Sequence, residues 1–251
     1  MSRTRLDLAL VDRGLLPTRA RARDAIARGT VTVDGRIETR ASAGVAPDAQ
    51  LAVDDPAAAW VSRSALKLAG ALDAFALSPE GALCLDVGAS TGGFTQVLLA
   101  RGAAKVTAID VGHGQLAPVL AADPRVTSIE GLNARDLAPE HLAAPPNFVV
   151  ADVSFISLTL ALPPALALAA PGARGVFLVK PQFEVGRAHV GKGGLVRDEA
   201  VALAGVDRIE AFLGDHGWRV RGRVASSLTG GDGNQEYLVA AEKNGDESGD
   251  R

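Results

Sequence analysis

An apolar run, a glycine-rich turn and an amphipathic segment follow one another near the middle of the chain, and this succession constrains the fold most. Residues 82–87 are apolar except for one acid, as expected of a strand buried on both faces of a sheet. The turn at residues 88–93 holds three glycines, which let the backbone approach a ligand closely. Residues 94–100 have the pattern of a helix, and residues 105–110 that of a second strand ending in a carboxylate.

Strand-like and helix-like segments continue to alternate toward the C-terminal end. Strands that alternate with helices pair in a mostly parallel sheet with helices on both faces, so the sequence predicts an α/β doubly wound sheet. Ligands of such sheets bind at the carboxyl ends of the strands. The later segments are strands at residues 148–152, 176–180, 218–220 and 237–240 and a helix at residues 197–215.

Charge is distributed unevenly along the chain. The 251 residues carry a net charge of −3, yet residues 1–40 hold nine arginines against five acids. A basic segment joined to an acidic remainder favours nucleic-acid binding at the basic end. The segment predicts helices at residues 6–11 and 19–28, then a hairpin that turns at Asp34-Gly35. The arginines of the second helix suit phosphate oxygens, although a solvated helix is the alternative.

Other features bear on location. Residues 153–173 are uncharged and long enough to span a bilayer, but Pro163, Pro164 and Pro171 interrupt them. We therefore expect a strand end, a loop and a buried helix there, and no membrane partner. A single cysteine excludes an internal disulfide framework, and no apolar leader begins the chain, so we expect a cytoplasmic protein.

The glycine-rich turn indicates a nucleotide-like cofactor. Asp110, at the end of the second strand, can accept hydrogen bonds from both hydroxyls of a ribose. The glycine spacing is not G-x-G-x-x-G, which disfavours a nicotinamide dehydrogenase. Residues 86–93 instead resemble the first motif of S-adenosylmethionine (SAM) methyltransferases, in which an acid before the turn supports the amino-acid end of the cofactor.

Four charged residues stand out: Lys67, Asp152, Lys180 and Glu236. Asp152 and Lys180 end predicted parallel strands, so we expect both in one crevice. The order of the four resembles the tetrad of ribose 2′-O-methyltransferases of the FtsJ/RrmJ type. A ribose hydroxyl is weakly acidic, so its attack on a sulfonium methyl needs proton removal and in-line positioning.

Each member of this tetrad has an expected role. We expect Lys180 to act as the base or as a cation that stabilises the forming alkoxide. Lys67 favours the neutral form of that amine, while Asp152 and Glu236 orient the amines. No metal is expected, because the leaving group is already a cationic sulfur, and the four histidines show no ligand spacing.

The chain as a whole resembles the TlyA family. The motifs are residues 61–68, 85–95, 109–116, 152–158, 180–184 and 190–198. In front of them, residues 3–50 resemble the alpha-L RNA-binding domain, which grips structured RNA mainly through phosphates. The resemblance implies a monomeric cytidine 2′-O-methyltransferase that uses SAM and acts on ribosomal RNA, with a Rossmann-like SAM-methyltransferase domain.

Domain bounds and further site residues follow from this resemblance. We expect an RNA-binding domain at residues 1–55, a linker at 56–62, a methyltransferase domain at 63–243 and a flexible tail at 244–251. The expected cofactor-binding residues are Asp86, Gly88, Ser90, Gly92, Gly93, Phe94, Asp110, Asn133 and Asp152. The expected RNA-binding residues are Arg5, Arg19, Arg21, Arg23, Arg28, Arg63, Arg187 and Lys192.

Two other functions remain open at this point. Many members of the family are labelled hemolysin A, so a membrane-active hemolysin is one alternative. The other is a non-catalytic RNA-binding or ribosome-assembly factor, which the intact tetrad disfavours. The glycine-rich residues 184–198 are either a lid that orders on RNA or a mobile surface loop.

Overall fold

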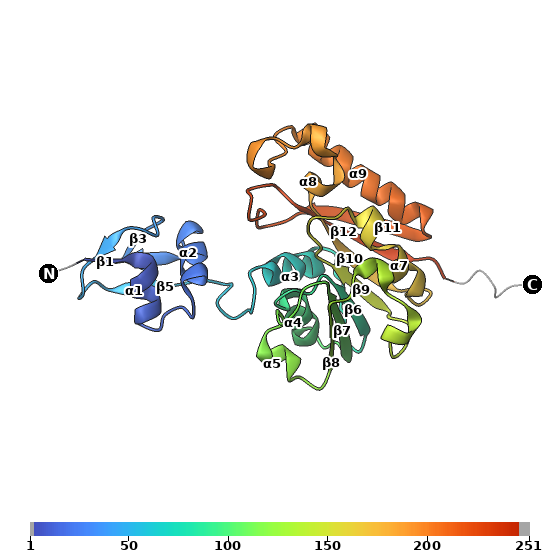
Figure 1. The fold of residues 1–251 in the computed structure, drawn as a ribbon, viewed down its shortest axis with the longest axis horizontal. Coiled ribbons are helices and arrows are strands. Elements are labelled where there is room, and N and C mark those ends of the chain that lie inside the picture. The colour runs from blue at the N-terminus through green and yellow to red at the C-terminus, as the bar shows by residue number, and fades with distance from the viewer. Residues whose placement is uncertain (1–2, 246–251) are drawn as a thin grey trace, which may run out of the picture. The chain divides into compact units, whose positions relative to one another are not determined.

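The computed structural model describes residues 3–245, and the chain divides into two compact units, Met1–Ala59 and Trp60–Arg251 (Figure 1). Each unit has its own hydrophobic core. The division lies inside the predicted linker at residues 56–62, and the domain bounds given above stay a prediction. Most of the predicted tail, residues 246–251, lies outside the described residues.

The first unit has the helix, helix and hairpin order that its sequence predicts. Ile26 packs inward, fully buried, and the hairpin turns through two residues with positive φ, Asp34 and Gly35, as its strand twist requires. Two further strand pairings, β2 with β5 and β1 with β4, were not predicted. The elements are β1 (Thr4–Arg5), α1 (Leu6–Asp12), α2 (Arg19–Ala27), β2 (Val31–Val33), β3 (Arg36–Ile37), β4 (Gly44–Val45) and β5 (Leu51–Val53).

The second unit is built on a seven-stranded sheet with the order β11-β12-β10-β9-β6-β7-β8. The five strands from β10 to β8 are parallel, whereas β12 is antiparallel to both of its neighbours. The predicted mostly parallel α/β sheet is confirmed. Its strands are β6 (Leu83–Val87), β7 (Lys105–Asp110), β8 (Val126–Glu130), β9 (Phe148–Ala151), β10 (Arg174–Val179), β11 (Trp218–Ala225) and β12 (Tyr237–Lys243).

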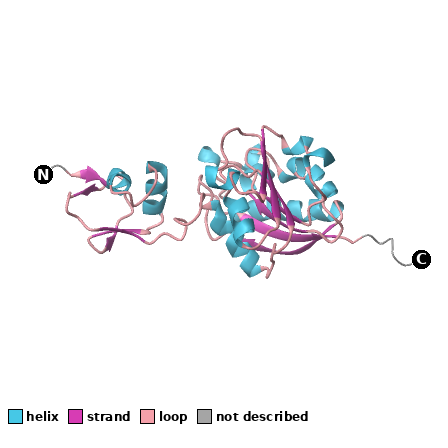
Figure 2. Ribbon diagram, turned by 90° about the horizontal axis from the view of Figure 1, so that it is seen from below, coloured by secondary structure: helices cyan, strands magenta, loops and turns pink. Residues whose placement is uncertain are grey.

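Helices cover both faces of this sheet (Figure 2). Along β9, Phe148 and Val150 face one core with α3, α4 and α5, while Val149 and Ala151 face the other with α6, α7 and α9. A strand buried on both faces is therefore apolar throughout. The helices are α3 (Ser64–Ala74), α4 (Gly93–Ala100), α5 (Pro118–Ala121), α6 (Leu158–Ala161), α7 (Pro163–Leu168), α8 (Pro181–Glu184) and α9 (Glu199–Asp215), with short 3-10 turns at Ala134–Asp136, Pro139–His141, Arg187–His189 and Lys192–Gly194.

The uncharged residues 153–173 form a loop and two short helices, α6 and α7. The tandem prolines open α7, where a missing backbone N–H costs no hydrogen bond. In the described part of the chain, no helix has the length and apolar character that a membrane crossing requires.

Candidate active site

The carboxyl edge of the parallel strands gathers the predicted tetrad. Asp152 directly follows β9 and Lys180 directly follows β10. Glu236 precedes β12, and because β12 runs antiparallel to β10 with Val179 opposite Tyr237, Glu236 reaches the same edge as Lys180. Lys67 arrives from α3, which packs against β10 and β12 on one face of the sheet.

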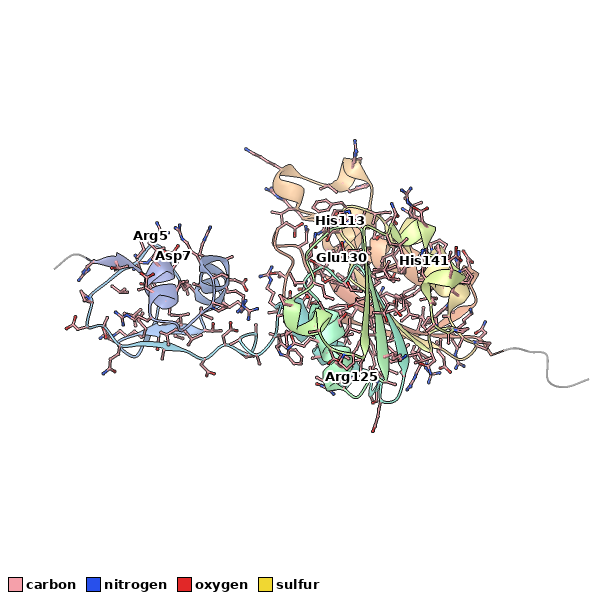
Figure 3. The ribbon with its side chains drawn as sticks, turned by 60° about the horizontal axis from the view of Figure 1, so that its bottom comes forward. Arg5, Asp7, His113, Arg125, Glu130 and His141 are labelled. Atoms are coloured by element: carbon pink, nitrogen blue, oxygen red, sulfur yellow. The ribbon has the colours of Figure 1, made fainter. Side chains whose placement is uncertain are left out.

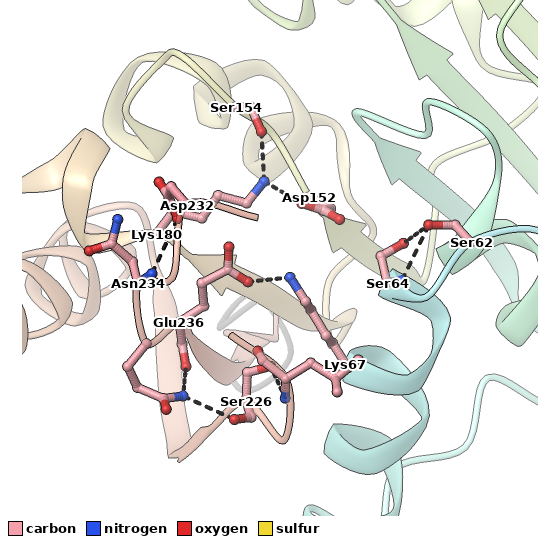
Figure 4. A network of polar contacts seen from close by, with 12 residues as sticks. Ser62, Ser64, Lys67, Asp152, Ser154, Lys180, Ser226, Asp232, Asn234 and Glu236 are labelled. Atoms are coloured by element: carbon pink, nitrogen blue, oxygen red, sulfur yellow. Dashed lines mark hydrogen bonds and ion pairs between the residues drawn. The ribbon is translucent and has the colours of Figure 1, made fainter. Parts of the chain in front are cut away.

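The four side chains form two ion pairs (Figure 4). Lys180 Nζ lies 2.7 Å from Asp152 Oδ1 and donates a hydrogen bond to Ser154 Oγ, also at 2.7 Å. Lys67 Nζ donates to Glu236 Oε2. The side chains of Lys67 and Glu236 are only 7% and 3% exposed, against 11% and 17% for Lys180 and Asp152. The pair that contains Lys180 is therefore the more accessible one.

A cavity of about 470 Å³ opens beside Asp152, within the usual size for a small-molecule site. Five of the predicted cofactor-binding residues line it: Gly88, Ser90, Asp110, Asn133 and Asp152. The carboxylate of Asp110 is fixed by backbone N–H groups of Ser90 at 2.8 Å and Gly112 at 2.7 Å. A carboxylate accepts about four hydrogen bonds, so Asp110 keeps acceptor capacity for a ligand.

A second cavity, of about 460 Å³, has Lys180 in its lining. Glu236, Phe155 and Gln182 are among its lining residues. A smaller space of about 170 Å³ is lined by Lys180 and Ser154 and by Gly88 and Asp152, which also line the first cavity. Lys180 and Ser154 line both the smaller space and the second cavity, so the amine lies between two spaces that could hold ligands.

The three glycines of the turn have different tasks. Gly88 lines the first cavity at a φ of 81°, and a Cβ there would lie 2.7 Å from the carbonyl oxygen of Asp152. A Cβ on Gly93 would lie 2.4 Å from Ser64 Oγ, and one on Gly92 would lie 2.3 Å from Leu120 Cδ1. Gly92 and Gly93 thus let helices pack closely, and neither lines a described cavity. Phe94 lines the smaller space.

Asp86 lies beneath the turn and lines none of the described cavities. Its side chain is fully buried, and its Oδ2 accepts a hydrogen bond of 2.6 Å from Thr95 Oγ1 in α4. Its Oδ1 has no partner among the described residues. Burial raises the pKa of Asp86 to about 7. Asp86 therefore fixes the start of α4 through Thr95.

This raised pKa predicts a pH-dependent stability. The unfolded chain ionises Asp86 near pH 4 and the folded chain near pH 7, so the contribution of Asp86 to stability is full below about pH 4 and is lost as pH rises to about 7. We expect the stability advantage of the wild type over Asp86→Asn to shrink from about pH 4.5 to about pH 8, measured by urea unfolding. Asp123→Asn is the control, because its Arg125 partner lowers the pKa of Asp123 to about 2, below this window. A difference that stays constant with pH for Asp86→Asn contradicts the prediction.

The sequence did not single out three residues that organise the site. Ser154 contacts Lys180, and Gln115 accepts a hydrogen bond of 3.1 Å from Ser90 Oγ beside the first cavity. Glu184 is 2% exposed and accepts from Ser157 Oγ at 2.5 Å and from the backbone N–H of Leu158 at 2.9 Å. Burial raises the pKa of Glu184. In the sequence, Glu184 could have been noticed as the single acid in residues 180–184, where it is the last residue.

The predicted RNA-binding residues have different surroundings. Arg23 is exposed on α2, and Arg187 and Lys192 are exposed in the glycine-rich loop, whereas Arg63 is half-buried. Arg21 donates to the carbonyl oxygen of Ala57 at 2.7 Å, so part of it serves the structure of the first unit. Half-buried Arg28 pairs with Asp24 and Asp55. Arg5 pairs with Asp7, and both are labelled in Figure 3. Arg19 contacts the same carboxylate. Residues 3–245 contain no group of three or more His, Cys, Asp or Glu side chains placed to hold a metal ion.

The mostly parallel sheet, the glycine turn after β6 and the acid at the end of β7 together define the fold of a SAM-dependent methyltransferase. Residues 60–243 match the FtsJ-like methyltransferase family, and residues 4–51 match the S4 domain. The chain belongs to the TlyA family of these enzymes.

Individual relatives carry two kinds of name. The chain is 48% identical over 94% of its length to the 16S/23S rRNA (cytidine-2′-O)-methyltransferase TlyA of Mycobacterium tuberculosis, covering 89% of that protein. It is 39% identical over 94% of its length to Hemolysin A of Brachyspira hyodysenteriae, covering 98% of that protein. A solved structure described as a hemolysin, from Streptococcus thermophilus, is 38% identical with a TM-score of 0.77, covering 97% of this chain and 90% of that one.

Proposed function

We propose that this chain transfers a methyl group from SAM to the ribose 2′-hydroxyl of cytidine in ribosomal RNA. The observation that carries the proposal is the placement of Lys180, held by Asp152 and Ser154, between two cavities at the carboxyl edge of the sheet. The printed activity of the M. tuberculosis relative supports the choice of cytidine and of ribosomal RNA.

SAM fits the first cavity by the chemistry of its lining. Asp110 offers fixed carboxylate oxygens for two ribose hydroxyls, and Gly88 lines the cavity with backbone alone. Asn133 lies in the same wall, and Asp152 supplies negative charge for an ammonium group. When bound, SAM supplies an electrophilic methyl group on a cationic sulfur, so the proposed reaction has no step that needs a metal.

The chain itself handles the proton of the ribose. With the target nucleotide in the second cavity, Lys180 Nζ takes the proton of the 2′-hydroxyl, or holds positive charge beside the oxygen as it becomes an alkoxide. To act as the base, Lys180 first gives a proton to a neighbour, and Asp152 is in contact with it. The Lys67–Glu236 ion pair is buried, and Glu236 lines the second cavity, so the pair would hold that side of the cavity in a fixed position during the proton transfer.

The proposal is tested by following labelled methyl groups. Purified chain, labelled SAM and unmodified ribosomal subunits are expected to yield labelled 2′-O-methylcytidine, identified by nucleoside mass spectrometry after digestion. Mapping both ribosomal RNAs would locate the nucleotide. A labelled base, a labelled protein, or no transfer to either subunit would contradict the proposal.

The first unit is proposed to supply RNA affinity. Removing residues 1–55 leaves both cores of the second unit intact, so SAM binding is expected to persist. RNA affinity is expected to fall by about tenfold or more, with a shallower salt dependence, because phosphate contacts release counterions. Filter binding at several salt concentrations measures this, and unchanged affinity across them argues against the role. The proposed RNA contacts are Arg5, Arg19, Arg21, Arg23, Arg28, Arg63, Arg187 and Lys192.

One chain is the proposed functional unit, because all four members of the tetrad come from the same chain. A ribosomal substrate would place the reaction in the cytoplasm. The hemolysin name of some relatives offers a different function, but nothing in residues 3–245 specifically favours it. Leakage of liposomes caused by purified chain would revive that alternative.

A further inference from the structure

Asp7 is an unusual residue in so small a unit. It lies in the first turn of α1, and its side chain is fully buried, with 0% exposure. Aspartate is almost never fully buried unless it is paired. Its backbone N–H donates to the carbonyl oxygen of Ala41 at 3.1 Å, so the residue is fixed at both its main chain and its side chain.

Two arginines hold the carboxylate of Asp7, and both come from the basic segment. Arg5 donates through Nε at 2.9 Å and through Nη2 at 3.1 Å, while Arg19 donates through Nε at 2.8 Å. The hydrogen bonds from Arg5, reinforced by Arg19, keep the pKa of Asp7 well below its usual range. The carboxylate is therefore charged at every pH at which the protein would work.

Arg5 and Arg19 each contact Asp7 and are also partly exposed to solvent. Their side chains remain 45% and 53% exposed although both contact a fully buried carboxylate. A guanidinium has five N–H donors, so most donors of Arg5 and Arg19 are not used by Asp7. Because both contact the same carboxylate, the two cationic groups are neighbours.

Neither Arg13 nor Arg40 of the same unit contacts a fully buried carboxylate: Arg40 pairs with Glu38, whose side chain is 20% exposed. Arg13 gives its guanidinium to the carbonyl oxygens of Ala46, Pro47 and Ala49. The contacts of Arg13 connect parts of the first unit to one another. The contacts of Arg5 and Arg19 with Asp7 instead fix the direction of the two side chains and leave several of their N–H donors unused by Asp7.

We propose that Asp7 is a positioning residue that holds Arg5 and Arg19 as one preset site for a phosphate group of structured RNA. Arginine pays a large entropy cost when a free side chain is fixed on a phosphate, and a side chain that is already fixed avoids it. The inference rests on the proposed function for the identity of the ligand as RNA. It assigns a role in RNA binding to an acidic residue that never touches the RNA.

A positioning role for Asp7 and simple electrostatics predict opposite changes in RNA affinity when Asp7 is replaced. Asp7→Asn removes a negative charge next to two arginines, so simple electrostatics predicts tighter binding of RNA. A positioning role predicts weaker binding, by about tenfold, because the arginines lose a charge-assisted anchor.

The experiment compares matched variants of the full chain. Dissociation constants for a labelled ribosomal RNA transcript are measured at several salt concentrations, with thermal unfolding followed by circular dichroism. Asp12→Asn is the control, since Asp12 is an exposed residue at the end of the same helix and its change alters the net charge equally. We expect Asp12→Asn to bind as tightly as the wild type or slightly more tightly, and Asp7→Asn to bind about tenfold more weakly.

A second variant keeps the carboxylate and the net charge. Changing Arg5 and Arg19 together to lysine retains both positive charges beside Asp7 but removes the planar group that is held through Nε. We expect a loss of affinity similar to that of Asp7→Asn. Should Asp7→Asn fail to fold, wild-type affinity in this double variant still overturns the inference.

Two results would overturn the inference: Asp7→Asn binding RNA as well as Asp12→Asn, or the double lysine variant binding like the wild type. Methyl transfer at saturating RNA separates this inference from the proposed function. A wild-type chain that binds RNA but transfers no methyl group defeats the proposed function and leaves the affinity comparison valid.

Discussion

Lys180→Ala is expected to lower the rate of methyl transfer at saturating RNA and SAM by roughly 10²–10⁴-fold, the usual contribution of a general base or charge-stabilising group. The binding of RNA should change little, because Lys180 is a single, largely buried charge in a large proposed interface. Single-turnover transfer of labelled methyl groups, together with filter binding, measures the two effects separately.

The control for this variant is Lys105→Ala. Lys105 is exposed at the start of β7, the opposite edge of the sheet from the tetrad, and its change removes the same charge. It should transfer methyl groups at the wild-type rate. Wild-type turnover by Lys180→Ala would defeat the assignment, and an equal loss in both variants would show that charge alone is responsible.

Glu236→Ala is expected to destabilise the second unit by about 3–5 kcal/mol, because it leaves the ammonium of Lys67 buried without its partner. Methyl transfer should also be lost, since the lining of the second cavity next to Lys180 is no longer held in position. Urea unfolding followed by tryptophan fluorescence measures the free energy, and the change should appear in the midpoint at constant slope.

Glu242→Ala provides a comparison within the same strand. Glu242 lies near the other end of β12 and pairs with exposed Arg219 and Arg221, so its loss should cost less than about 1 kcal/mol. An equal loss in the free energy of unfolding for Glu236→Ala and Glu242→Ala would show that burial of the Lys67–Glu236 pair does not increase the destabilisation. Replacing Lys67 and Glu236 together with apolar residues of similar size should restore much of the stability without restoring activity.

The sequence predicted the parts of the fold that have strong local patterns. The central strands β6, β9 and β10 are mainly apolar runs because helices cover both of their faces, and this made them predictable. Strand β8 was missed, since it lies at the edge of the sheet and its residues are mostly partly exposed. The two-residue strands β1 and β4 are too short to show any period.

The sequence also predicted that the tetrad would gather, but not how it would pair. The pairing of Lys67 with Glu236 and of Lys180 with Asp152 depends on the register of β12 against β10 and on the position of α3 over them. Neither is encoded in local spacing. Likewise, all three glycines of the turn were expected at the cofactor, and only the three-dimensional packing separates Gly88 from Gly92 and Gly93.

The antiparallel position of β12 has a consequence for synthesis of the chain. Lys67, Asp152 and Lys180 emerge from the ribosome early, but the buried partner of Lys67 is Glu236, and the strand that holds it ends at Lys243. A growing chain therefore lacks the complete tetrad until Glu236 and β12 have been made. Truncation before Glu236 would leave a protein with the first cavity and with Lys67 lacking its buried partner.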